Sequence, residues 1–205
     1  AFVWAAGVGS AAYLGGRGGY CIDSEGADLV LRGFTTANSI ENIDAGGYSI
    51  LGTSGRNTLD FSITNFVNVT AVDGLDDHDT LTASRNQGAP LFGNSGNDLI
   101  YGSNGADELY GGPGNDTIEG RDGNDLITGG DGSDTLYGQN QNDTFFWFDG
   151  DDIDTFLGGS GTDTIQVTDA NLPLSGFTTA NSIEAIVGTG SEGIVGTSGR
   201  NALDF

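Results

Sequence analysis

The fold of this chain is decided by residues 93–146, which read GNSGNDLIYGSNGADELYGGPGNDTIEGRDGNDLITGGDGSDTLYGQNQNDTFF. This stretch divides without remainder into six nonapeptides. Position one is always glycine, and position four is glycine in the first five repeats. Position six is always aspartate: Asp98, Asp107, Asp116, Asp125, Asp134 and Asp143. Position eight is always large and apolar: Ile100, Leu109, Ile118, Ile127, Leu136 and Phe145.

The spacing within each nonapeptide predicts a turn followed by a short strand. Glycines at positions one, two and four permit the positive φ angles that other residues resist. Positions seven to nine then form a strand, with position eight on one face and its two neighbours on the other. One aliphatic residue in nine cannot form a core alone, but stacked coils align these side chains into a continuous buried ladder. We therefore expect an all-β solenoid.

The pattern continues downstream in a weaker form. After a two-residue slip at 147–148, the segments DGDDIDTFL (149–157) and GGSGTDTIQ (158–166) resume it. They place Asp154 and Asp163 at position six. The aromatic run FFWF, which overlaps the slip, is interpreted as a cap that closes the apolar ladder; an exposed aromatic contact surface is the alternative.

Upstream copies are weaker still. The segment GLDDHDTLT (74–82) places Asp79 at position six. Further back, Gly26, Asp28 and Val30 keep the spacing of positions four, six and eight. This spacing predicts a degenerate repeat near the start of the chain, with Val30 facing inward.

A second, longer repeat encloses the nonapeptides. Residues 33–61, which begin GFTTANSIE, return as residues 176–205, with an offset of 176 − 33 = 143 residues. This duplication predicts a tandem array in a longer parent protein. The expected organisation is an N-terminal apolar segment with a degenerate repeat, a β-rich solenoid segment, the six nonapeptides, an aromatic cap with degenerate repeats, and the start of a second long copy: 1–32, 33–92, 93–146, 147–175 and 176–205.

Composition points to a cationic partner. The chain has 29 acidic and 6 basic residues among 205, a net charge of −23, and 37 glycines. Such a composition ordinarily predicts disorder, but 36% of the residues are hydrophobic and recur at fixed spacing. Bound cations reconcile the two facts, whereas nucleic acid would be repelled by the acidic surface. The single cysteine, Cys21, excludes an internal disulfide, and no apolar stretch is long enough for a membrane span.

The six nonapeptides resemble the repeats of the RTX family, whose pattern is GGxGxDxUx. The resemblance implies a right-handed parallel β-roll with calcium-binding turns, in which two repeats complete one turn and repeats n and n+2 stack. Each Ca²⁺ would lie between two stacked loops, held by position-six aspartates and backbone carbonyls, and such hard oxygen ligands suit calcium. It implies four full sites, at the pairs Asp98–Asp116, Asp116–Asp134, Asp107–Asp125 and Asp125–Asp143, with Asp154 and Asp163 as further candidate ligands.

The repeats depart from the family pattern at five positions. The second glycine is replaced by Asn94, Ser103, Arg121 or Gln139, and the glycine at position four of the last repeat is replaced by Gln141. We expect the site of the last repeat to be the most affected. The resemblance also implies export from a bacterium, with type I secretion, and an extracellular or cell-surface location.

No catalytic constellation accompanies the repeats, so we expect no enzymatic activity. His78 is the only histidine, the sequence contains no GxSxG nucleophile motif, and no motif surrounds Cys21. Paired carboxylates could act as general acid and base, but the repeat pattern already accounts for nearly every aspartate. The leading hypothesis is a calcium-binding structural or adhesive module of a surface layer, fibre or adhesin, with end-to-end self-association into a filament or array. The alternative is the secretion and folding module of an exported enzyme or toxin whose active domain lies outside this chain.

Overall fold

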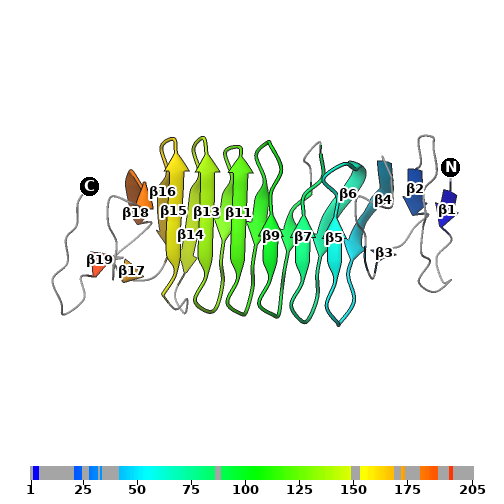
Figure 1. Ribbon diagram of the computed structural model, residues 1–205, viewed down its shortest axis with the longest axis horizontal. Helices are drawn as coiled ribbons and strands as arrows, with labels where there is room; N and C mark the ends of the chain where they lie inside the picture. Colours follow the sequence, from blue (N-terminus) through cyan, green and yellow to red (C-terminus); the bar gives the residue numbers. More distant parts are fainter. Residues whose placement is uncertain are drawn as a thin grey trace.

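A computed structural model describes residues 2–4, 21–24, 28–31, 33, 42–85, 89–148, 153–168, 172–173, 181–188 and 194–195 (Figure 1). The regular structure in these ranges consists almost entirely of strands that pair in parallel. Successive coils follow one another in chain order along the long axis of the molecule (Figure 1). In the part of the chain that the structure describes, no helix is long and apolar enough to span a bilayer.

Two parallel sheets form the walls of the solenoid. The larger sheet contains, in order, β1 (Phe2–Trp4), β2 (Cys21–Ser24), β4 (Asn42–Leu51), β6 (Asn65–Asp73), β8 (Leu91–Phe92), β10 (Glu108–Tyr110), β12 (Leu126–Thr128), β14 (Thr144–Phe148), β16 (Thr164–Thr168) and β18 (Ala185–Gly188), with β3 (Leu29–Val30) beside β4. The smaller sheet contains β5 (Thr58–Asp60), β7 (Thr80–Thr82), β9 (Leu99–Tyr101), β11 (Thr117–Asp122), β13 (Thr135–Asn140) and β15 (Thr155–Ser160). Strands β17 (Leu172–Pro173) and β19 (Ile194–Val195) pair separately.

The strand register confirms that two nonapeptides make one coil. Ile100 pairs with Ile118, and Ile118 pairs with Leu136, so each step along this sheet advances the chain by 18 residues. In the other sheet Leu109 pairs with Ile127, and Ile127 with Phe145. Alternate repeats therefore stack in the same wall, and the chain forms the β-roll that the family resemblance implies.

The position-eight side chains form the buried ladder that the spacing predicts. All six of these residues in 93–146 have an exposed fraction of 0%. Their neighbours at positions seven and nine are half-buried or exposed, as the alternation along a strand requires. Burial at this one position, multiplied over the stacked coils, is what supplies the core.

Two details of the ladder differ from expectation. The aromatic run 145–148 lies inside the stack instead of at its end, because β14 pairs with β12 on one side and β16 on the other. Phe145 and Trp147 face the core, and the ladder continues past them. Upstream, Leu29 is fully buried while Val30 is 42% exposed, so the expected inward position of Val30 was wrong. Pairing of Leu29 with the buried Ile50 of β4 sets this register.

The long repeat is also visible in the strand pairing. Strand β2 pairs with β4 through Cys21–Asn42 and Ile22–Ile43. Strand β16 pairs with β18 through Thr164–Ala185 and Ile165–Ile186. Each residue of the second set follows its counterpart in the first by 143 positions, since 164 − 21 = 143 and 185 − 42 = 143. The same pair of strands therefore recurs at both ends of the described solenoid.

Candidate metal centre

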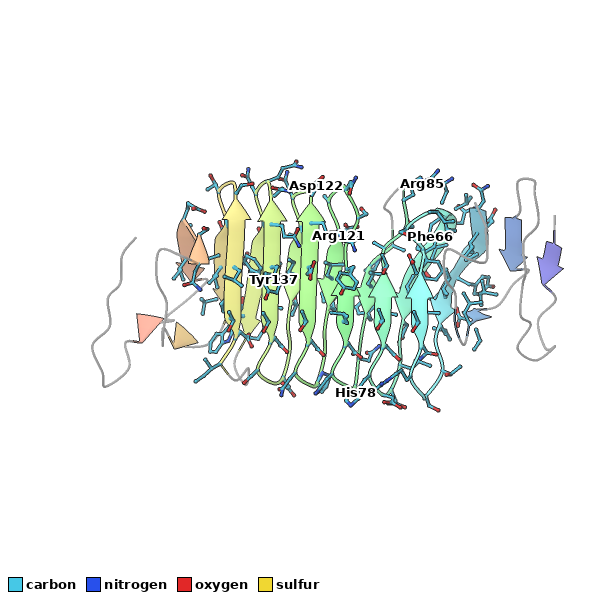
Figure 2. The ribbon with its side chains drawn as sticks, viewed as in Figure 1. Phe66, His78, Arg85, Arg121, Asp122 and Tyr137 are labelled. Carbon is cyan, nitrogen blue, oxygen red and sulfur yellow. The ribbon has the colours of Figure 1, made fainter. Side chains whose placement is uncertain are left out.

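The position-six side chains form two columns along opposite edges of the solenoid. The first column, called column A, runs through the loops that lead into the smaller sheet: Asn57, Asp79, Asp98, Asp116, Asp134 and Asp154. The second column, called column B, runs through the loops that lead into the larger sheet: Asp107, Asp125, Asp143, Asp163 and Glu184. Figure 2 shows His78, beside column A, at one edge and Asp122, beside column B, at the other.

Within each column one carboxylate oxygen links adjacent coils. The backbone N–H of Asp98 donates to Oδ1 of Asp116 at 2.7 Å, and that of Asp116 donates to Oδ1 of Asp134 at 2.7 Å. In column B the N–H of Asp125 donates to Oδ1 of Asp143 at 2.9 Å. All eight aspartates predicted as ligands take part in such a ladder, and the four predicted pairs are all stacked neighbours.

The other carboxylate oxygen is buried without a hydrogen bond. Within the described residues this holds for Oδ2 of Asp79, Asp98, Asp116, Asp125, Asp143 and Asp163. Such an orphaned acceptor is costly to bury and is rare in folded proteins. The side chains themselves are no more than 3% exposed. The fold therefore leaves a row of buried negative oxygens that require a positive partner.

Backbone carbonyls face the same oxygens across the position-one glycines. A Cβ built on Gly74 would lie 2.5 Å from Oδ2 of Asp79 and 2.9 Å from the carbonyl oxygen of Gly93 in the next coil. Gly93 and Gly111 hold the same two kinds of oxygen close to their Cα atoms. Two acceptors that face each other repel unless a cation or a proton lies between them. The donor set of carboxylate and carbonyl oxygens fits a hard cation such as Ca²⁺.

The pKa values of several column aspartates are raised, as expected for buried carboxylates without a positive partner. Burial raises the pKa of Asp116, Asp125 and Asp143 to about 7, and repulsion from stacked carboxylates adds to the shift. Burial also raises the pKa of Asp98 to about 6. Without a cation, the ionised form of these carboxylates is disfavoured because burial removes its hydration.

Side-chain ligands alone do not complete a site. Among the residues that the structure describes, no group of three or more histidine, cysteine, aspartate or glutamate side chains converges on one point. An ion in either column would therefore rely on backbone carbonyls in addition to the stacked aspartates.

A parallel ladder of position-five side chains flanks the columns. Asn115 N–H donates to Oδ1 of Asn97, and Ser133 N–H donates to Oδ1 of Asn115, both at 2.9 Å. His78 occupies the same place one coil earlier, where its Nδ1 accepts the N–H of Asn97 at 2.6 Å. The only histidine therefore has a structural partner in the repeat.

The structure extends the columns beyond the residues that the sequence singled out. Asp98 and Asp143 each have a further stacked neighbour, Asp79 and Asp163, so they are interior members and not the ends of their columns. Glu184 was missed, although its Oε2 accepts the N–H of Asp163 at 2.7 Å. It lies outside any nonapeptide, and only its place just before a strand that stacks on β16 could have indicated it.

The replacement at position four of the last repeat does not distort the backbone. Gln141 adopts φ 76°, and φ is also positive at four of the five glycines that occupy this position in the other repeats, namely Gly96, Gly114, Gly123 and Gly132. Asp143 keeps the regular ladder contact to Asp125. The substitution that does change a loop is Ser103, because its N–H donates to Oδ2 of Asp107 at 2.5 Å and satisfies an oxygen that elsewhere is orphaned.

Comparison with known families agrees with this geometry. The family model described as the RTX calcium-binding nonapeptide repeat (4 copies) matches residues 91–118 and 110–145. The two matched ranges contain all six position-six aspartates of the central stretch. No curated protein and no solved structure matches the chain.

Proposed function

We propose, from the premise that the central repeats belong to the RTX calcium-binding family, that this chain is a structural module which folds on calcium binding outside a bacterial cell. The proposal includes a tandem arrangement in a surface layer, fibre or adhesin. It also includes the absence of enzymatic activity in this segment. Ca²⁺ would supply the positive charge between stacked loops, and the protein's own oxygens would hold and orient it.

The observation that carries the proposal is the row of orphaned Oδ2 atoms. Each is buried within a few ångströms of a glycine where a carbonyl oxygen of the next coil also lies. Without cations, a glycine-rich backbone must offset both its ordering entropy and the repulsion of these oxygens. With cations, binding to the folded state alone stabilises that state by mass action.

The tandem arrangement draws support from the strand pairing. The β2–β4 pair and the β16–β18 pair occupy the same register, displaced by 143 residues. A chain in which the long unit recurs can therefore continue the solenoid through equivalent strand contacts from one unit to the next. Stacked units of this kind would form a filament with an uninterrupted apolar ladder.

The second candidate is a secretion and folding module for an exported enzyme or toxin. RTX repeats are typical of secreted proteins, and the same calcium chemistry serves that function. The sequence of the full gene separates the two: further copies of GFTTANSIE favour the array, and an adjoining hydrolase or pore-forming segment favours the module.

Circular dichroism and thermal melting in calcium and in chelator test the proposal. Extracellular calcium modules typically bind at about 10⁻⁴–10⁻³ M, so a titration to about 10 mM covers the range. We expect β structure with a cooperative melt in calcium and its loss in chelator. An identical spectrum and melting temperature in the two buffers would refute calcium-dependent folding.

A further inference from the structure

Among the loops that the structure describes in full, two differ from the other position-six loops in their backbone conformation. In the regular loops of the central stretch, position two lies in the left-handed region, with φ 65° at Asn94, 113° at Gly112 and 77° at Arg121. Position four is also left-handed, as at Gly114 and Gly132. In the loops 52–57 (GTSGRN) and 102–107 (GSNGAD), neither position two nor position four lies in that region.

The two exceptional loops share one hydrogen-bond pattern, in which a hydroxyl residue at position two closes the loop. Thr53 N–H donates to Oδ1 of Asn57 at 3.1 Å, and its hydroxyl donates to Gly55 O at 3.3 Å and to Asn57 Oδ1 at 3.0 Å. Ser103 N–H donates to Oδ2 of Asp107 at 2.5 Å. The Ser103 hydroxyl contacts Gly105 O at 3.5 Å and Asp107 Oδ1 at 3.3 Å.

Among the residues that the structure describes, these loops are the first members of the two columns. In column A the head residue is Asn57, whose amide Nδ2 donates to Thr53 O at 2.9 Å, Gly74 O at 3.2 Å and Asp79 Oδ1 at 3.0 Å. Three oxygens thus surround a nitrogen, in the place where the regular loops have an orphaned Oδ2. A Cβ on Gly52 would lie 2.8 Å from this Nδ2 and 2.5 Å from Gly74 O. The amide supplies the hydrogens that the regular loops lack.

In column B the head is Asp107, and the positive charge comes from Arg121. Its Nη1 donates to the carbonyl of Gly102 at 2.8 Å, and the guanidinium carbon lies 4.9 Å from the ring centre of Tyr101. Ser103, Arg85 and Arg121 line one pocket, so two arginines lie close to the position-two residue of this loop. Figure 2 shows Arg121 above Tyr137 on the side where Asp122 lies.

We propose that the loops 52–57 and 102–107 are calcium-independent caps, in which Asn57 and the pair Ser103–Arg121 take the place of an ion. Calcium binding then begins one coil further in, at Asp79–Asp98 in column A and at Asp125–Asp143 in column B. The Asp107–Asp125 pair, which the repeat pattern includes among four sites, holds no ion. The inference rests on the proposed calcium-binding function and specifies which loops take part in it.

Such caps would give the calcium-bound part of the roll a fixed starting template. A coil that is satisfied by its own donors holds its shape before any ion binds, and the next loop can then order against it. The sequence signature is a hydroxyl residue in place of the second glycine. The same GTSGRN letters return at 196–201, within the second copy of the long repeat.

The number of calcium ions bound per chain tests directly whether the loop 102–107 in column B binds an ion. Equilibrium dialysis with radioactive calcium counts the ions bound per chain, and isothermal titration calorimetry gives an independent count. The test variant is Ser103→Gly with Arg121→Gly, which restores the family pattern in both loops. We expect it to bind one more ion per chain than the wild type.

The matched control is Gln139→Gly. Gln139 also stands at position two with φ 76°, so glycine relieves the same backbone strain as at Arg121. Its side chain, however, donates to Oε2 of Glu119 at 3.0 Å and supplies no positive charge. We expect the ion count of this variant to equal that of the wild type. An unchanged count in the double variant, or an equal gain in the control, overturns the assignment of Ser103 and Arg121.

Column A provides a second, independent test. Asn57→Asp with Thr53→Gly converts its cap into a regular loop and should also add one ion per chain. Circular dichroism in saturating calcium checks that each variant is folded before ions are counted. If both converted loops leave the count unchanged while the wild type binds calcium, the cap inference fails and the proposed function stands; if the wild type binds no calcium, both fail.

Discussion

Replacing Asp116 by asparagine should stabilise the protein in chelator and destabilise it in saturating calcium. Asp116 is 1% exposed, its Oδ2 lacks a hydrogen bond, and burial raises its pKa to about 7 from an ordinary 3.8. An asparagine keeps the Oδ1 acceptor for the N–H of Asp98. Its amide can also donate toward the carbonyl of Gly129, in the way that Asn57 donates to Gly74.

The size of the effect follows from the pKa. The folded calcium-free state holds the proton of Asp116 more tightly than the unfolded state does. The free energy of unfolding therefore falls by about 1.4 kcal/mol for each pH unit between the unfolded and the folded pKa, and the loss is complete above the folded pKa. After allowance for solvent screening we expect Asp116→Asn to stabilise the calcium-free protein by about 2–4 kcal/mol at pH 8. For a chain of this size that is roughly 4–16 °C in melting temperature.

In saturating calcium the same substitution should lower the melting temperature, since Asp116 faces two stacked loops and the amide carries no charge. Differential scanning calorimetry in chelator and in calcium measures both effects. Asp131→Asn, in an exposed loop position, removes the same charge and should move neither melting temperature by more than a degree or two. A lower melting temperature for Asp116→Asn in chelator would refute the idea that Oδ2 lacks a positive partner.

Three further predictions concern the columns. In chelator the free energy of unfolding should fall as the pH rises from about 4 through about 7. The raised pKa values of Asp116 and Asp125 contribute stability that is present below 3.8 and lost above the folded values. Thermal melts at a series of pH values measure this, and a stability that rises over that window would contradict it. Gly111→Ala should weaken calcium binding at least tenfold by calorimetry, because the added Cβ would overlap Oδ2 of Asp116 and the carbonyl oxygen of Gly129. Wild-type affinity in this variant would show that these two oxygens do not bind the ion. Asp125→Ala should raise the calcium midpoint of folding more than Asp107→Ala, since the Asp107 carboxylate is already bonded to Ser103; equal midpoints by circular dichroism would count against the difference between the two loops.

Much of the architecture is determined by the sequence because every nonapeptide shows the same apolar position and the same aspartate position. Each repeat has one obligatory apolar position and one aspartate, and the 18-residue stack places Ile100 beside Ile118 and Asp98 beside Asp116. Local turn chemistry and the alternation of a short strand predict the buried position and the aspartate position of each repeat, and the resemblance to the RTX family implies the stacking of alternate repeats. The weaker repeats at Asp154 and Asp163 were found in the same way, and both stand in the columns.

Tertiary structure alone decided which further residues join the columns in the described part of the chain and in which loops a position-two residue bonds to position six. Asn57 and Glu184 have no aspartate to mark them, and only the stacking of coils shows that they belong to the columns. The backbone N–H of Asn57 donates to Oδ1 of Asp79, and Oε2 of Glu184 accepts the backbone N–H of Asp163. Leu29 replaced Val30 as the inward residue because the strand pairs with β4 in that register, which no local pattern specifies. The different roles of Ser103 and Gln141, two departures from one pattern, depend on backbone φ angles and on the partner atoms that the stacked coils supply. Sequence sets the repeating unit, whereas stacking determines which of its oxygens are left without a donor.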